Sequence, residues 1–192
     1  MLRRIAFLLI LVVVTALPAQ AGIWVSGTLP TSFAFSSDGN DLYDFDQISS
    51  TGVSGYSVLA SIPFPLLPVV GMSEFTIDLV PNDVDIEGTN SVKFNTYDVA
   101  FDFSGGLADV LVGYGVGLAT FECGQSDCES FTFEQREVFQ YFGQIGVPFG
   151  VGSNFHIDMR RIIGRVQVDS GADALDLNLQ GVLFAFGFRF GF

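Results

Sequence analysis

The chain contains a single histidine, so any catalytic scheme that needs an imidazole must use His156. Asp158 follows two residues later, which places both side chains on the same face of an extended strand. A serine nucleophile needs a base within hydrogen-bond reach, but no serine stands two residues after His156 and no other serine is recognisable as its partner. We therefore predict that the protein is not an enzyme, and that His156 is hydrogen-bonded to Asp158 or to a neighbouring tyrosine.

Acidic residues crowd into a few polar stretches between apolar segments. Carboxylate oxygens suit Ca²⁺ or Mg²⁺, and the stretch DGNDLYDFD (38–46) has alternating acids, but it lacks the glutamate spacing of an EF-hand loop. A rim that binds divalent cations is one interpretation. We favour a solvated rim with no metal and no cofactor, formed by Asp38, Asp41, Asp44, Asp46, Asp83, Asp85, Glu87, Glu122, Asp127 and Glu129.

The first 21 residues have the layout of a secretory signal peptide. Arg3 and Arg4 precede an apolar run from Ile5 to Leu17, and Ala19-Gln20-Ala21 fits a cleavage site. The sequence therefore predicts a signal peptide over 1–21 and one mature domain over 22–192. In an exported chain the two cysteines, Cys123 and Cys128, are expected to form a disulfide.

The charge balance argues against a nucleic-acid partner. The expected mature part carries 6 basic and 21 acidic residues, a net charge of −15. Phosphate backbones are bound through Lys and Arg, and this chain has too few of them for nucleic acid to be the expected partner.

Eight segments of the mature part alternate between apolar residues and small or polar ones with a period of two. The last segment ends in FAFGFRFGF (184–192), with a phenylalanine at every second position. Such alternation predicts β-strands. The expected strands cover about 23–35, 52–62, 70–80, 93–103, 110–119, 131–147, 155–168 and the C-terminal segment.

The connections between these segments alternate between long acidic stretches and short stretches rich in Pro or Gly. No segment after the signal peptide has about 18 uninterrupted apolar residues, the signature of a transmembrane helix. A sheet in lipid must close on itself to satisfy its backbone groups. The sequence therefore predicts an all-β fold, an eight-stranded antiparallel up-and-down transmembrane barrel whose apolar faces contact lipid.

Charged residues within the predicted strands divide by sign along the chain. An unpaired charge in a narrow interior costs several kcal/mol, so we predict a cross-lumen ion-pair network that plugs the bore, with a gate for small ions as the alternative. Arg160 and Arg161 are expected to flank a bulge that turns both inward. The predicted network comprises Glu74, Asp78, Asp98, Asp102, Arg136, Arg160, Arg161, Arg165 and Arg189.

The signal peptide, the eight segments and the terminal aromatic pattern resemble the small outer-membrane barrels of Gram-negative bacteria, typified by the transmembrane domain of outer-membrane protein A. The resemblance implies that Phe188, Phe190 and Phe192 form the signal read by the barrel-assembly machinery. It also implies that both termini and the short turns are periplasmic and the long loops extracellular.

These barrels have varied functions, so the fold does not assign one. We expect a monomer with a structural or surface-interaction role, whose partners are outer-membrane lipid and lipopolysaccharide, with an extracellular ligand at the acidic loops as a further possibility. The alternative is a narrow pore or carrier for small or apolar solutes. Barrel enzymes that deacylate lipid A use a serine two residues after the histidine, where this chain has Asp158.

Overall fold

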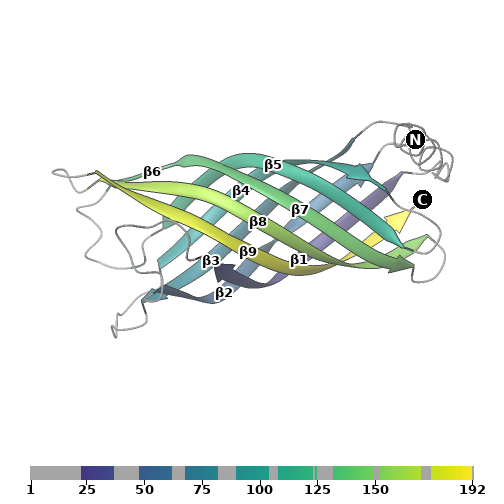
Figure 1. Ribbon diagram of the computed structural model, residues 1–192, viewed down its shortest axis with the longest axis horizontal. Helices are drawn as coiled ribbons and strands as arrows, with labels where there is room; N and C mark the ends of the chain where they lie inside the picture. Colours follow the sequence, from purple (N-terminus) through teal and green to yellow (C-terminus); the bar gives the residue numbers. More distant parts are fainter. Residues whose placement is uncertain are drawn as a thin grey trace, which may run out of the picture.

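The strands of the protein form one antiparallel sheet that closes into a barrel (Figure 1). The computed structural model describes residues 23–36, 48–61, 68–81, 90–103, 108–122, 124, 132–148, 152–169 and 174–191. The strands are β1 (Trp24–Phe35), β2 (Ile48–Ser61), β3 (Val69–Pro81), β4 (Asn90–Asp102), β5 (Asp109–Glu122), β6 (Thr132–Glu134), β7 (Arg136–Pro148), β8 (Ser153–Asp169) and β9 (Ala174–Gly191). In this part of the chain, no helix has the length and apolar character needed to cross a membrane.

The short β6 and the longer β7 act as one strand. Only Gln135 separates them, and both pair with β8. The barrel therefore has eight strands, each hydrogen-bonded to its sequence neighbours. β1 and β9 complete the circle through a ladder from Trp24↔Gly191 to Phe35↔Gly181. The predicted fold class is confirmed.

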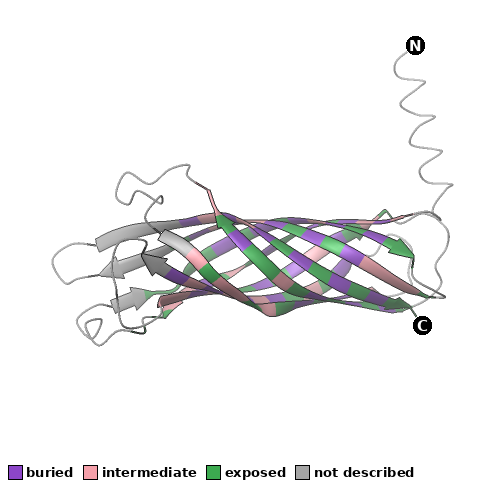
Figure 2. Cartoon of the chain, turned by 90° about the horizontal axis from the view of Figure 1, so that it is seen from below, coloured by how far each residue is buried: buried purple, intermediate pink, exposed green. Residues whose placement is uncertain are grey.

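β1 begins and β9 ends at the same end of the barrel, which we call the termini end (Figure 1). The opposite end is called the distal end. Buried and exposed residues alternate along the strands (Figure 2). Val112, Phe101 and Phe186 are about half exposed on the outer surface, as the apolar pattern predicts.

The apolar face of the strands changes side part-way along the barrel. Near the termini end of β4, Tyr97 and Phe101 point outward and Asp98 is buried inside. Towards the distal end of the same strand, Phe94 is buried inside and Lys93 lies outside. The alternation keeps its phase, but the inner and outer residue types are exchanged.

The same exchange on β3 corrects an expectation from the sequence. Phe75, Ile77 and Leu79 were expected to face lipid, yet they are buried in the interior, which places their neighbours Glu74 and Asp78 on the outer face. The inner distal half of the barrel is an apolar cluster formed by Phe33, Phe75, Ile77, Leu79, Val92, Phe94, Ala119, Val138, Ile162, Leu179, Leu183 and Ala185.

A second apolar cluster occupies the interior nearer the termini end. It comprises Trp24, Leu59, Val69, Ala100, Leu111 and Phe142. On β3 the order from the termini end is Val69, then polar Ser73, then Phe75. A polar layer therefore lies between two apolar clusters.

The expected bulge at Arg160 and Arg161 is absent. Their pairs Phe142↔Arg160 and Tyr141↔Arg161 belong to an uninterrupted ladder. Arg160 is buried inside and Arg161 faces outward. Ile162 faces inward by the ordinary alternation of the strand and joins the apolar cluster there, so no inserted residue is needed. Register shifts occur elsewhere, at Pro30/Ser32 in β1 and Ser50/Gly52 in β2.

Candidate functional site

Arg160 stands at the centre of the polar layer, with no exposed surface. Its Nε donates to Asp158 Oδ1 at 3.2 Å and Oδ2 at 3.1 Å. Nη1 donates to Ser73 Oγ at 2.8 Å and Asp98 Oδ2 at 3.1 Å, and Nη2 to Ser57 Oγ at 2.8 Å and Asp158 Oδ2 at 2.7 Å. A guanidinium has five N–H donors, so every one of them has an acceptor here.

The two carboxylates that face Arg160 are themselves held by neutral donors. Asp98 Oδ1 accepts hydrogen bonds from Thr96 Oγ1 at 2.9 Å and Gln140 Nε2 at 2.6 Å, and Asp98 Oδ2 accepts one from Ser73. Asp158 Oδ2 accepts from Gln144 Nε2 at 2.8 Å. Buried charges persist when they are paired and hydrogen-bonded, and this layer meets both conditions.

Backbone and aromatic groups leave just enough room for this layer. Gly115 of β5 faces inward, and a Cβ there would collide with Asp98 Oδ1 and lie 2.8 Å from Gln140 Nε2. The Arg160 guanidinium also lies 4.4 Å from the Phe142 ring centroid and 5.2 Å from that of Phe75. These rings belong to the apolar clusters on either side, so the charge is enclosed above and below.

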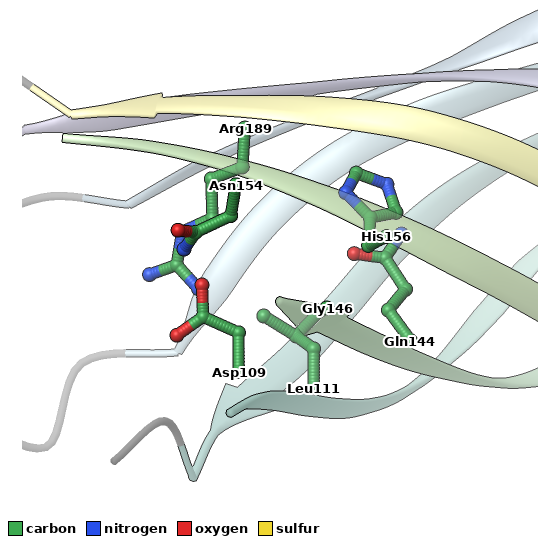
Figure 3. Close-up of a pocket in the computed structure, with 7 residues that line it drawn as sticks. All are labelled: Asp109, Leu111, Gln144, Gly146, Asn154, His156 and Arg189. Carbon is green, nitrogen blue, oxygen red and sulfur yellow. The ribbon is translucent and has the colours of Figure 1, made fainter. Parts of the chain in front are cut away.

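A second, smaller ion-pair group lies at the termini end (Figure 3). Arg189 Nη2 is 2.5 Å from Asp102 Oδ2, and Nη1 is 3.5 Å from Asp109 Oδ2. The Arg189 guanidinium lies 3.5 Å from the Trp24 ring centroid. Asp109 Oδ2 is buried and has no hydrogen bond within the described part of the structure, so its compensation is the Arg189 charge.

His156 faces the interior, where it borders a cavity lined by Asp109, Leu111, Gln144, Gly146, Asn154 and Arg189 (Figure 3). The Nε2 atom lies 3.3 Å from Ser26 Oγ and 3.1 Å from Thr28 Oγ1. These β1 hydroxyls, and not Asp158 or a tyrosine, are its hydrogen-bond partners. Gly187 leaves space for the ring, because a Cβ there would meet His156.

The structure brings together only part of the expected ion-pair network. Asp98 meets Arg160, and Asp102 meets Arg189. Arg136 lies near the rim and pairs with Glu134 at 3.2 Å.

The remaining expected members lie on the outer surface of the barrel. Glu74 pairs with Lys93 at 3.0 Å, Asp78 lies beside Gly52 of β2, and Arg161 and Arg165 face outward. The sequence pattern predicts an inward position for them only if the apolar face stays outside along the whole strand. The exchange of faces between Met72 and Glu74 on β3 is the reason for the difference.

Sequence reasoning did not include Asp158 and Asp109 in the predicted ion-pair network. Asp158 stands two residues from Arg160 on the same strand face, so the period-2 pattern contained the signal for that pair. Asp109 is the first residue of β5, and no charged residue stands two positions before or after it to give a comparable signal. Ser26 and Thr28 lie 130 and 128 residues from His156 in the sequence, and no local pattern connects them.

Several predicted features lie outside the described residues. These are the signal peptide, Cys123 and Cys128, Phe192, and the acidic rim apart from Glu122. Among the residues that the structure does describe, no group of three His, Cys, Asp or Glu is arranged to hold a metal ion.

Solved structures of three outer-membrane proteins resemble this barrel. OprG from Pseudomonas aeruginosa is 13% identical with a TM-score of 0.54, over 90% of this chain and 96% of that chain. AlkL, determined in DMPC lipid bilayers, is 12% identical with a TM-score of 0.54, over 89% and 90%. Outer Membrane Protein W of E. coli is 13% identical with a TM-score of 0.52, over 90% and 98%.

No protein family matches the chain by sequence, and no curated protein matches it. The structural likeness, at such low identity, shows the fold alone. It confirms the resemblance to small eight-stranded outer-membrane barrels that the alternating pattern indicated.

Proposed function

We propose that the protein is an integral barrel of a Gram-negative outer membrane, with a closed lumen and a structural or surface-interaction role. The fold it shares with three outer-membrane proteins supports this location. The outer surface supports it further, because large apolar side chains gather there: Val25, Leu29, Tyr56, Val58, Val70, Met72, Tyr97, Phe101, Val112, Tyr114, Val116, Leu118, Phe139, Tyr141, Ile145, Ile157, Met159, Phe184, Phe186, Phe188 and Phe190. We call this set the apolar band.

The height of the apolar band suits a bilayer. On β5 it runs from Val112 to Leu118, and the half-buried Val110, which also faces outward, extends it to eight steps of about 3.4 Å along the strand. With a strand tilt of about 40°, this corresponds to a height of about 20 Å, close to the roughly 25 Å of outer-membrane barrels. Polar outward residues such as Thr120 and Lys93 follow beyond it.

The burial of the interior side chains is the observation that supports a closed lumen. Arg160, Asp158, Leu59, Ile77 and Leu183 have no exposed surface. The Arg160 layer, in which every guanidinium donor has an acceptor, lies between the two apolar clusters. To pass through the barrel, water and ions would have to displace the charged pairs and the packed aromatic rings. An eight-stranded barrel has an interior that side chains can fill.

Planar-bilayer recording tests the closed lumen. Protein that has been refolded, and shown to be folded by heat-modifiable gel migration, is expected to give no steady conductance. The double variant Phe142→Ala and Arg160→Ala removes side chains from the polar layer and an adjacent cluster, and is expected to admit ions. A steady conductance of the unaltered protein would contradict the proposal.

The orientation and partners follow from the same proposal. Both termini would be periplasmic, outer-membrane lipid and lipopolysaccharide would surround the apolar band, and the barrel-assembly machinery would recognise the C-terminal aromatic residues. The acidic loops would offer the surface for an extracellular ligand. The proposal includes no enzymatic activity, since His156 is buried and its two hydroxyl neighbours, Ser26 and Thr28, are buried with it.

A carrier for apolar solutes is the second candidate. It is favoured by the apolar cluster of the distal interior, against which Phe35, Val53 and Phe121 are only partly buried. Such a lining would accept an apolar molecule and exclude ions. If this candidate holds, Phe94→Asp will reduce uptake of an apolar dye into protein-containing vesicles, whereas Lys93→Asp on the outer face of the same strand will not.

A further inference from the structure

The outer surface just beyond the apolar band carries a localised positive charge on β8. Met159 is the last exposed apolar residue before Arg161 on this strand, and Arg165 follows four residues later. The cross-strand partners of Arg161 are Tyr141 on β7 and Val182 on β9. Arg161 is therefore the first charged side chain above the lipid-facing surface of this wall.

The Arg161 side chain is held in place but keeps free donors. Its Nη2 donates to Ser36 Oγ at 3.3 Å and to Gln180 Oε1 at 3.2 Å. Among the described residues, Nε and Nη1 have no acceptor, which leaves three of the five N–H groups available. The side chain is partly buried, so its aliphatic part lies against the barrel wall while its charge reaches the surface.

Most other outward charges on β3 and β5 that the structure describes beyond the apolar band have the opposite sign. Glu74, Asp78 and Glu122 face outward on β3 and β5, and Lys93 is paired with Glu74. Glu137 of β7 is exposed near Arg165, because the next residue, Val138, pairs with Gly164. An anion would therefore be attracted chiefly to Arg161.

We propose that Arg161, supported by Arg165, Ser36 and Gln180, binds the phosphate of an anionic lipid headgroup in the adjoining leaflet. Guanidinium donors bind phosphate oxygens in a fork geometry. The acyl chains of the same lipid would lie on Met159 and Phe184, which are both exposed directly below. This inference rests on the proposed function, because only a membrane-embedded barrel places a lipid phosphate at this level.

Native mass spectrometry of the full chain in detergent micelles tests the site. The probes are phosphatidic acid, with an exposed phosphate, and phosphatidylcholine, whose phosphate is masked by choline. The unaltered protein is expected to retain phosphatidic acid preferentially. Arg161→Gln should weaken that binding about tenfold, as expected for the loss of charge-assisted hydrogen bonds. Arg161→Lys keeps the charge without the fork and should give a smaller loss.

Lys93→Gln is the matched control, because it removes one outward positive charge on another strand, β4. Equal binding by Arg161→Gln and the unaltered protein would overturn the inference, and so would an equal loss in Lys93→Gln. Displacement of the lipid by inorganic phosphate at similar concentration would also overturn it, since a free-anion site would explain the result. Heat-modifiable migration reports on the proposed function separately, because a chain that never folds as a barrel defeats both proposals.

Discussion

At the scale of single residues, Arg160 shows how a charge is kept in a fully buried position. Its two carboxylate partners come from β4 and β8, and each of them also accepts a hydrogen bond from a hydroxyl or an amide donor. The gain from such a pair barely exceeds the cost of removing its members from water, but breaking it leaves uncompensated charges. Removing Arg160 should therefore lower the free energy of unfolding by much more than the intact ion pairs raise it.

Arg160→Met is expected to lower the free energy of unfolding by about 3–5 kcal/mol, because Asp98 and Asp158 would remain buried without their cation. Arg165→Met is the control, since an exposed arginine should change stability by no more than about 0.5 kcal/mol. Urea titration of both variants in lipid vesicles measures the difference. Adding Asp98→Asn and Asp158→Asn to Arg160→Met should restore part of the loss. Similar midpoints for the two single variants would show that the layer is not energetically important.

At the scale of strands, the exchange of apolar faces has a simple physical cause. A strand needs about 9–11 residues to cross a bilayer, whereas β8 has 17 and β9 has 18. In the proposed membrane setting, the outside of the barrel beyond the apolar band meets water. Polar residues therefore belong on the outer face there, and apolar residues form the interior core. The alternation of side chains continues unchanged, while the medium outside the sheet changes.

An arginine scan along the outer face tests this explanation. Val112→Arg lies within the apolar band and is expected to destabilise the barrel by about 2–4 kcal/mol. Thr76→Arg lies beyond the band on β3 and is expected to cost about 1 kcal/mol or less. Both can be measured by denaturant titration in vesicles of one lipid. A comparable cost at the two sites would mean that the distal half of the barrel is also embedded in lipid.

At the scale of the whole molecule, closure depends on the pairing of the first and last strands. The β1–β9 ladder extends to Trp24↔Gly191 at the termini end. Phe188 and Phe190 of this ladder point outward and are about half exposed. The same residues therefore serve the proposed assembly signal with their side chains and the ladder with their backbone, and the two roles can be separated.

Deletion of residues 190–192 should prevent closure both in vitro and in cells, because it removes backbone partners of Trp24 and Val25. The double variant Phe188→Ala and Phe190→Ala keeps the backbone ladder. It is expected to refold in vitro but to accumulate slowly as a folded barrel in cells. Heat-modifiable migration of refolded protein and of membrane extracts measures both effects. Normal accumulation of the double variant would argue against an aromatic assembly signal.

Local patterns in the sequence were sufficient for the architecture. Strand number, strand direction and the outward position of residues such as Val112 and Phe186 follow from alternation with a period of two. This alternation is a property of the extended backbone itself. Asp158 and Arg160 are interior partners only two residues apart on one strand, so the same alternation indicates that they share a face.

Which residues meet in the interior could be determined only from the closed barrel. Arg160 meets Ser57 and Asp98 across 103 and 62 residues of sequence, and Arg189 meets Asp102 across 87. Which charges become partners is decided by the register and curvature of eight strands together. Likewise, the inward position of Phe75 and the outward position of Glu74 depend on where the sheet leaves the apolar band, which is a property of the assembled barrel and its surroundings.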